Sequence, residues 1–328
     1  MCRPGSTRIQ WRRTDPGRAG RKEAVAAPTD DRDRTGASRT AELATVSRAR
    51  HLLRHRKPHI FEDPFAIHLL GKRWRRIVAS RLLDWVLAKI VMNKLVPISI
   101  QQLTRARFAE EKLEAAAENG ATQYVILGSG FDSFAFRRPD LDLTVFEVDR
   151  AEMIRLKVER LAAANLEIPA RLHLVPFDFE RGDLRSALTA AGFDLGARSF
   201  FNWMGVTYYL TRDSILENLD RLAEIASSGS EIVFDYLIAA ECVPPEDRDL
   251  FSRLMAFVEK RGEPMISRFD PARVGAILNP RNHWEIVGND SPTDHHRKYL
   301  EGRTDLPPLA PITWCLHLRR SAAGPKPA

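Results

Sequence analysis

The sequence has little of what marks disulfide-rich, metal-binding or membrane-spanning proteins. Its three cysteines, Cys2, Cys242 and Cys315, lie far apart and form no CxxC or Cys/His pattern. Neither a disulfide scaffold nor a zinc site is therefore predicted, and a reducing, cytoplasmic setting is the default expectation. A membrane-spanning helix needs about 18 or more consecutive apolar residues. The nearest stretch, residues 82–100, is interrupted by Asp84 and two lysines, so we expect no membrane partner.

The positive charge is concentrated near the amino terminus. The formal net charge is +7, and residues 1–39 hold ten basic and five acidic side chains (+5), which leaves 40 basic and 38 acidic side chains (+2) for the rest. Residues 1–37 contain few large apolar side chains, so we predict a disordered basic tail there, and a second disordered tail at 321–328. A nucleic-acid-binding module that uses the basic tail and Trp74-Arg75-Arg76 is one alternative function, but the near-neutral remainder argues against it.

The hydrophobic pattern changes along the chain from helical to alternating. Residues 38–120 predict an N-terminal helical cap, and residues 121–320 predict a core in which short apolar runs alternate with helices. This pattern is typical of an α/β fold with a doubly wound, mainly parallel sheet, here seven-stranded and Rossmann-like. Residues 241–270 break the rhythm and predict a lid insertion after strand five. The predicted strands are Tyr124–Leu127, Leu143–Val148, Leu172–Pro176, Ser199–Met204, Ile232–Leu237, Trp284–Val287 and Ile312–Leu318.

Glycines, carboxylates and an aromatic residue follow the first three predicted strands. Strand one ends at Gly128-Ser129-Gly130, where missing side chains let backbone amides approach a ligand. Strand two ends at Asp149, where a carboxylate can accept hydrogen bonds from both hydroxyls of a ribose. Strand three is followed by Asp178 and Phe179, which can accept from an exocyclic amine and line an adenine slot. Ligands of doubly wound sheets bind at the carboxyl ends of the strands, so the three signals together indicate a nucleoside site.

Each signal alone has a simpler explanation, because a glycine pair can be a turn and Asp149 can cap the helix that follows it. The glycine pattern then distinguishes a dinucleotide from a cofactor without phosphate. A dinucleotide site wants a third glycine where a helix N-terminus cradles the pyrophosphate, but this chain has Ser133 there, and Asp132 would place negative charge beside the phosphates. A cofactor without phosphate fits better. An NAD(P)-dependent Rossmann oxidoreductase remains an alternative.

Residues Val125–Arg137, followed by Phe146–Asp149 and a helix with Lys157 and Arg160, resemble the leucine carboxyl methyltransferase family. That family includes bacterial polyketide carboxyl O-methyltransferases and a group of actinobacterial methyltransferases. The resemblance implies a class I methyltransferase fold with S-adenosyl-L-methionine as cofactor. Further matches, in order along residues 38–318, are Thr40-Ala41, Arg48-Ala49, Asp63–Ala66, Arg105–Ala109, Gly205–Leu210 and Gly262–Pro264.

The resemblance also implies roles for particular residues. Arg105 would pair with the methionine carboxylate of the cofactor, although a solvated cation on a helix face is its simpler interpretation. The other implied cofactor contacts are Gly128 and Gly130 beneath the methionine and ribose, Asp149 on the ribose hydroxyls, Asp178 on the adenine amine and the Phe179 backbone amide on the adenine ring.

One position departs from the family pattern. The family commonly has a glutamate immediately before Gly205, where it helps to order the amino-acid end of the cofactor, and this chain has Met204. Asn202 is a candidate substitute, with a strand-end polar role as its alternative. The departure keeps open a catalytically impaired protein with a methyltransferase fold.

The acceptor is expected to be a small molecule with an acidic oxygen. A carboxylate is already ionised and needs no general base, and no histidine follows a predicted strand end to serve as one for a hydroxyl; we expect His295 and His296 in an exposed polar loop. Tyr208 and Tyr209 are candidate catalytic residues, with core packing as their alternative. The apolar side chains of the cap and lid predict a hydrophobic, polyketide-like acceptor; they include Trp85, Phe251, Met255 and Phe257.

Overall fold

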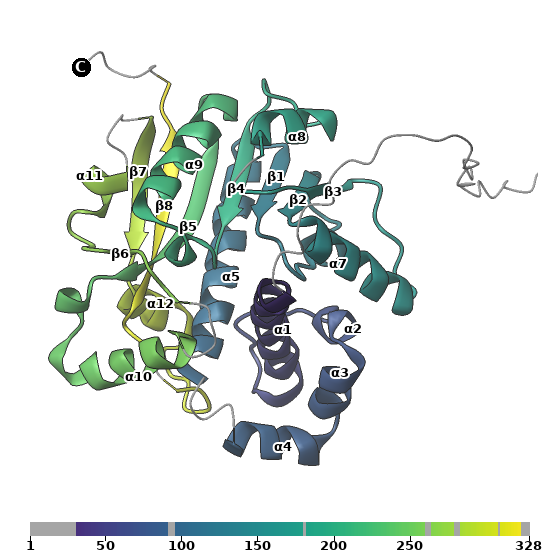
Figure 1. Cartoon of the computed structure of the whole chain (residues 1–328), viewed down its shortest axis with the longest axis vertical. Coiled ribbons are helices and arrows are strands. Elements are labelled where there is room, and N and C mark those ends of the chain that lie inside the picture. Colours follow the sequence, from purple (N-terminus) through teal and green to yellow (C-terminus); the bar gives the residue numbers. More distant parts are fainter. Residues whose placement is uncertain are drawn as a thin grey trace, which may run out of the picture.

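The computed structural model describes residues 31–90, 96–179, 182–259, 264–278, 283–307 and 309–322. Within them the chain forms an eight-stranded sheet flanked by helices and preceded by a helical cap (Figure 1). The predicted α/β, doubly wound, mainly parallel architecture is confirmed. The strands are β1 Gln123–Leu127, β2 Thr144–Asp149, β3 Leu172–Pro176, β4 Ser199–Trp203, β5 Glu231–Ile238, β6 Arg268–Phe269, β7 Trp284–Asp290 and β8 Thr313–Arg320.

The strand order is β3-β2-β1-β4-β5-β8-β7, with β6 paired to β5 off this path. β8 is antiparallel to both of its neighbours, and the other described pairings are parallel. The prediction of seven strands missed β6, whose two residues are too few to produce an alternating pattern. The order reverses between β1 and β4, which is where a doubly wound sheet opens its ligand crevice.

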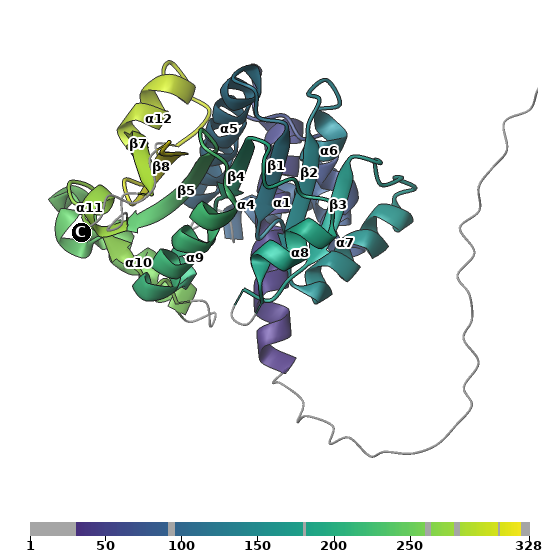
Figure 2. The same cartoon turned by 90° about the horizontal axis from the view of Figure 1, so that it is seen from above.

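Side chains alternate between two apolar layers on the two faces of the sheet. Val125 and Leu127 of β1 pack in the cluster that contains the buried faces of α8 (Leu184–Ala190) and α9 (Arg212–Ile225). Tyr124 and Ile126 pack on the opposite side, with α5 (Val96–Glu118) and α6 (Phe134–Arg137). Figure 2 shows α8 and α9 on one side of the sheet and α5 and α6 on the other. The alternating side chains of β1 therefore contact the helices on both faces of the sheet.

The cap lies beneath the carboxyl ends of β1 and β2 in the view of Figure 1. It consists of α1 (Asp31–Arg54), α2 (Ala66–Leu69), α3 (Lys72–Ala79) and α4 (Arg81–Ile90), and it leads into α5. α1 begins at Asp31, so residues 31–37, which we predicted to belong to the disordered tail, are helical. The predicted tail residues 1–30 and 323–328 lie outside the described residues.

Helices alternate with strands in the chain after β5. The insertion holds η3 (Ala240–Cys242), η4 (Pro245–Asp247) and α10 (Arg248–Glu259), and α11 (Val274–Leu278) follows β6. His295 and His296 lie on α12 (Pro292–Tyr299), so the expected polar loop was wrong. Ser291 and Asp294 form a capping box with proline in the first turn, a helix-start signal in the sequence that the loop interpretation overlooked. His295 is buried against Phe108.

Among the helices of the described residues, none is both long enough and apolar enough to cross a membrane.

Candidate functional site

The ends of the first three strands meet at one edge of the sheet. The Gly128 amide donates to the Val148 carbonyl at 2.8 Å, and the Phe177 amide donates to the Asp149 carbonyl at 2.8 Å. Gly128 and Asp178 therefore follow β1 and β3, and Asp149 is the last residue of β2, so the three residues lie along the same edge. A nucleoside site at the carboxyl ends of these strands requires the three residues to lie at one edge.

The two glycines of the loop after β1 have backbone conformations and neighbours that suit glycine alone. Gly128 has φ +72°, and a Cβ added there would lie 2.8 Å from the Cγ2 atom of Val206. Gly130 has φ +53°, and its added Cβ would lie 3.2 Å from the Cβ atom of Ala41 on α1. Side chains at either position would be strained and crowded. The loop thus passes closely between the turn after β4 and the first cap helix.

Asp149 organises this loop through its carboxylate. Oδ2 accepts a hydrogen bond from the Gly130 amide at 2.7 Å, and Oδ1 accepts one from the Arg150 amide at 2.7 Å. Burial raises the pKa of Asp149, while the two amide bonds oppose that rise. An ionised carboxylate has about four acceptor positions, so two remain for a ligand.

Asp178 and Phe179 lie farther out along the same edge. Asp178 is exposed, and its carbonyl accepts the Gly182 amide at 2.8 Å. The half-buried Phe179 packs edge-on against Phe177, with 5.1 Å between ring centroids. An exposed acid beside an aromatic wall is compatible with the predicted adenine contact.

Arg105 is held inside the protein, not on a solvated helix face. Its Nη1 atom donates to Oδ2 of Asp235 at 2.8 Å and to Oη of Tyr208 at 2.9 Å. Gly205 packs against the guanidinium, since a Cβ added there would lie 2.7 Å from Nη2. Sequence reasoning missed Asp235. Its signal was an acid within residues Ile232–Leu237, whose other side chains are apolar or aromatic; such an acid points to a paired buried charge.

The contacts of Asn202 at the end of β4 support its role as a polar residue of the strand end. Its Nδ2 atom donates to Oη of Tyr124 at 2.7 Å, and its Oδ1 atom accepts the Met204 amide at 3.2 Å. Asn202 is thereby engaged at the strand end. Met204 packs at the border of the cluster beneath α5.

A fully buried ion pair lies behind the loop after β1. Lys157 on α7 (Ala151–Ala163) pairs with Oε2 of Glu147, two residues before Asp149, and also donates to the Asp132 carbonyl at 2.6 Å. Burial raises the pKa of Glu147 to about 7. The resemblance pointed to Lys157 without a role, and the structure shows that it ties α7 and β2 to the loop.

α1 contacts the other side of the loop. Arg48 donates from Nη2 to the Phe131 carbonyl at 2.6 Å and from Nε to Asp63 at 2.8 Å. Arg160 of α7 donates to the Leu69 carbonyl at 2.7 Å and its guanidinium lies 4.2 Å from the Phe131 ring centroid. The cap is therefore fastened directly to the loop that carries the glycines.

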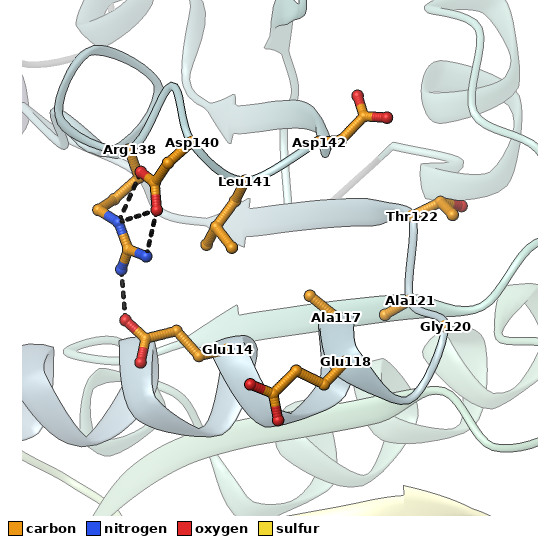
Figure 3. Close-up of a pocket in the computed structure, with 10 residues that line it drawn as sticks. All are labelled: Glu114, Ala117, Glu118, Gly120, Ala121, Thr122, Arg138, Asp140, Leu141 and Asp142. Carbon is orange, nitrogen blue, oxygen red and sulfur yellow. Dashed lines mark hydrogen bonds and ion pairs between the residues drawn. The ribbon is translucent and has the colours of Figure 1, made fainter.

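A cavity of about 520 Å³ lies at the opposite end of the sheet, beside the residues that precede β1 and β2 (Figure 3). Some of its charged side chains pair with one another: Arg138 forms ion pairs with both Glu114 and Asp140. It shares no residue with the edge described above. The cavity is therefore separate from the candidate site, which lies at the carboxyl ends of the strands.

The strand order, the antiparallel strand β8 and the glycine–acid–acid edge define a class I methyltransferase fold. Solved structures agree with this at the level of the fold. A Thermobifida fusca YX protein described as a methyltransferase matches with a TM-score of 0.53 at 14% identity, covering 86% of this chain and 98% of that one. A DUF574 family protein from Streptomyces avermitilis matches with a TM-score of 0.50 at 15% identity, covering 73% and 90%.

Sequence comparisons identify the family. The family model for leucine carboxyl methyltransferase matches residues 41–223. YktD of Bacillus subtilis (strain 168), named for S-adenosyl-L-methionine-dependent methyltransferase activity, is 31% identical over 292 residues, covering 82% of this chain and 93% of the relative. A Mycobacterium tuberculosis (strain H37Rv) relative named in the same way is 30% identical over 216 residues, covering 63% and 68%. The chain belongs to the leucine carboxyl methyltransferase family and is an S-adenosyl-L-methionine-dependent methyltransferase.

Proposed function

We propose that this methyltransferase transfers the methyl group to an oxygen of a carboxylate or acidic hydroxyl on a small, hydrophobic, polyketide-like metabolite. In this proposal Asp149 holds the ribose hydroxyls, Asp178 and the Phe179 amide contact the adenine, and Arg105 pairs with the methionine carboxylate. The observation that carries it is the shared edge, where the glycine loop and Asp149 are joined by the hydrogen bond from Gly130.

The residues fit the cofactor in three respects. The loop after β1 has positive φ at Gly128 and Gly130, with Val206 and Ala41 close to the two positions, so it presents bare backbone there. Asp149 keeps free lone pairs for hydroxyl donors. Arg105 presents a guanidinium, whose planar fork suits a carboxylate, and its side chain is 17% exposed.

When bound, S-adenosylmethionine supplies an electrophilic methyl group on a sulfonium, which an acceptor oxygen attacks opposite sulfur. The chain's own task is to hold that oxygen in line at about 3 Å and to exclude water. An acceptor with an ionised oxygen needs no proton removed.

Tyr208 is suited to donate a hydrogen bond and not to act as a base. Burial raises its pKa to about 12, so it stays protonated near neutral pH. Arg105 already donates to its Oη atom, which leaves the hydroxyl hydrogen of Tyr208 available for an acceptor oxygen or the cofactor. Several histidines are engaged elsewhere: His173 stacks on Phe146, and His317 bonds to Glu231 at 2.7 Å.

Support for an apolar acceptor comes from one side chain of the cap. Trp85 on α4 is 54% exposed. Phe251 on α10 is buried under Arg268, with 5.5 Å from guanidinium to ring centroid, so helix packing accounts for it. Met255 is partly buried beside the same cluster, and the Phe257 side chain lies outside the described residues.

Calorimetric titration with S-adenosylhomocysteine tests the cofactor placement. The wild type should bind, and Asp149→Ala should lose affinity by about 10-fold or more, because hydrogen bonds to a charged group are among the stronger ones. Unchanged affinity in Asp149→Ala would remove the proposed ribose contact.

A panel of matched aryl acceptors tests the acceptor class. A benzoic acid, a phenol and a benzyl alcohol with the same apolar substituent should be methylated in that order of decreasing rate at pH 7. Preference for the neutral alcohol would contradict the proposal. If the wild type binds S-adenosylhomocysteine but methylates none of a broad panel of acceptors, the alternative of a catalytically impaired protein is favoured. Met204, in place of the family's glutamate, is the reason for that alternative.

A further inference from the structure

Asp235 is a fully buried carboxylate in the middle of the sheet. It lies on β5, where every residue from Glu231 to Ile238 is buried, and its side chain is 0% exposed. Taking a charge out of water is costly, and a buried ion pair is often no more stabilising than apolar side chains of the same volume. The presence of Asp235 in this strand therefore calls for an explanation other than stability.

The carboxylate joins two segments that are distant in sequence. Oδ1 accepts the Gly205 amide at 2.6 Å, and Oδ2 accepts Nη1 of Arg105 at 2.8 Å. The backbone carbonyl of Asp235 also accepts the hydroxyl of Thr207. One residue of β5 thereby fixes the turn after β4 and the guanidinium from α5.

The turn that Asp235 fixes is adjacent to the glycine loop. Gly205 has φ +82° and lies against Nη2 of Arg105, and the next residue, Val206, lies against Gly128. Arg105 is therefore held beside the candidate cofactor site through its contact with Gly205.

The bonds to Asp235 and Tyr208 engage one nitrogen of the guanidinium. Among the described residues, the hydrogen bonds of Arg105 all come from Nη1. Nε and Nη2 form the second fork of the group, which matches the two oxygens of a carboxylate. This leaves a bidentate edge for a ligand.

We propose that Asp235 is a positioning residue, whose carboxylate fixes the Arg105 guanidinium and the Gly205 amide so that the Nε/Nη2 fork of Arg105 receives the methionine carboxylate of the cofactor. This inference rests on the proposed cofactor placement and adds a positioning role for Asp235.

Two ligands that differ in the amino-acid end separate this role from a structural one. S-adenosylhomocysteine carries the carboxylate, and 5′-methylthioadenosine keeps the nucleoside but lacks the amino-acid end. Asp235→Asn keeps the size of the side chain and removes its charge. We expect it to weaken S-adenosylhomocysteine binding by about 10- to 100-fold, from the loss of hydrogen bonding to a charged group, and to change methylthioadenosine binding less than about twofold.

Asp84→Asn is the matched control. Asp84 is also buried and paired with arginines, Arg50 and Arg54, but it lies on α4 in the cap. This variant should lower the melting temperature without changing the ratio of the two affinities. If Asp235→Asn lost affinity equally for both ligands, or lost affinity for neither, the proposal would be overturned.

A double-mutant cycle tests whether Asp235 acts through Arg105. In an Arg105→Met background, Asp235→Asn should cause little further loss of S-adenosylhomocysteine affinity, because the shared partner is gone. The same fold-loss in both backgrounds would overturn the proposal. Where Asp235→Asn fails to fold, Asp235→Glu displaces the carboxylate by one methylene and must show the same selective loss. A wild type that binds neither ligand would instead refute the cofactor placement itself.

Discussion

At the scale of single residues, Gly128 combines two constraints, a positive φ and close contact with Val206. Gly128→Ala should weaken S-adenosylhomocysteine binding by about 10-fold or more, because the added Cβ lies 2.8 Å from Val206 Cγ2 and forces the loop to move. The positive φ of +72° adds about 1–2 kcal/mol of strain. Calorimetry and thermal melts measure the two effects.

Gly192→Ala separates strain from crowding in the same experiment. Gly192 has φ +98°, but a Cβ added there meets nothing within 4 Å. This control should lower the melting temperature and leave ligand affinity unchanged. Adding Val206→Ala to Gly128→Ala should recover part of the affinity. No recovery would mean that the contact with Val206 is not what fixes the loop.

A second residue-scale prediction concerns Glu147. Burial raises its pKa from 4.5 in the unfolded chain to about 7 in the folded protein. Between these values the folded state binds more protons than the unfolded state, so the contribution of Glu147 to stability falls as pH rises from about 4.5 to 7. Glu147→Gln removes this dependence. The stability of the variant relative to wild type should therefore improve as pH rises and level off above pH 7.

Urea unfolding at half-unit steps from pH 5 to 8 measures this difference. The exposed Glu152→Gln on α7 is the control for the same substitution outside the ion pair. A constant gap between Glu147→Gln and wild type over the whole range would show that Glu147 titrates with its ordinary pKa.

The residues of the site were unequally predictable from the sequence. Gly128 and Gly130 follow a strand whose apolar run is visible, and Asp149 ends the next one, so their place at one edge could be derived from the strand pattern. The link between Arg105 and Asp235 spans 130 residues, and it depends on how α5 packs on β5. A local pattern contains no information on such a pair.

At the scale of elements, α1 and the glycine loop are connected by Arg48. Arg48→Met should lower S-adenosylhomocysteine affinity several-fold and raise hydrogen exchange in residues 128–133, because it removes the 2.6 Å bond to the Phe131 carbonyl. Arg50→Met is the control: Arg50 lies two residues along α1 and pairs with Asp84 at 2.5 Å. Faster exchange of the loop in both variants alike would contradict a specific contact by Arg48.

The lengths of elements decided which of them the sequence predicted. β1, β3 and the long helices α5 and α9 have enough residues for a clear period. β6 has two residues and α6 has four. Each covers only about one period of its pattern, which is too short to be distinguished from chance. α12 was missed for a different reason, since its polar composition outweighed the capping signal at Ser291.

At the scale of the whole molecule, the cap and the core share contacts at the loop that they enclose. Arg48 and Arg160 cross between them, and Ala41 touches Gly130. We therefore expect one cooperative unfolding transition. A ligand that binds only the folded state stabilises it by about 2.7 kcal/mol at a concentration 100 times its Kd, and this gain should appear in cap and core alike.

Native-state hydrogen exchange measures that distribution. Amides of α1 from Thr45 to Ala49 and amides of β1 and β4 should open with the same free energy, and S-adenosylhomocysteine should raise both values equally. The reason is that α1 must stay folded for Arg48 and Ala41 to contact the loop after β1. If α1 opened at lower free energy and did not respond to the ligand, the cap would be an independent unit. The loop contacts would then contribute nothing to cofactor binding.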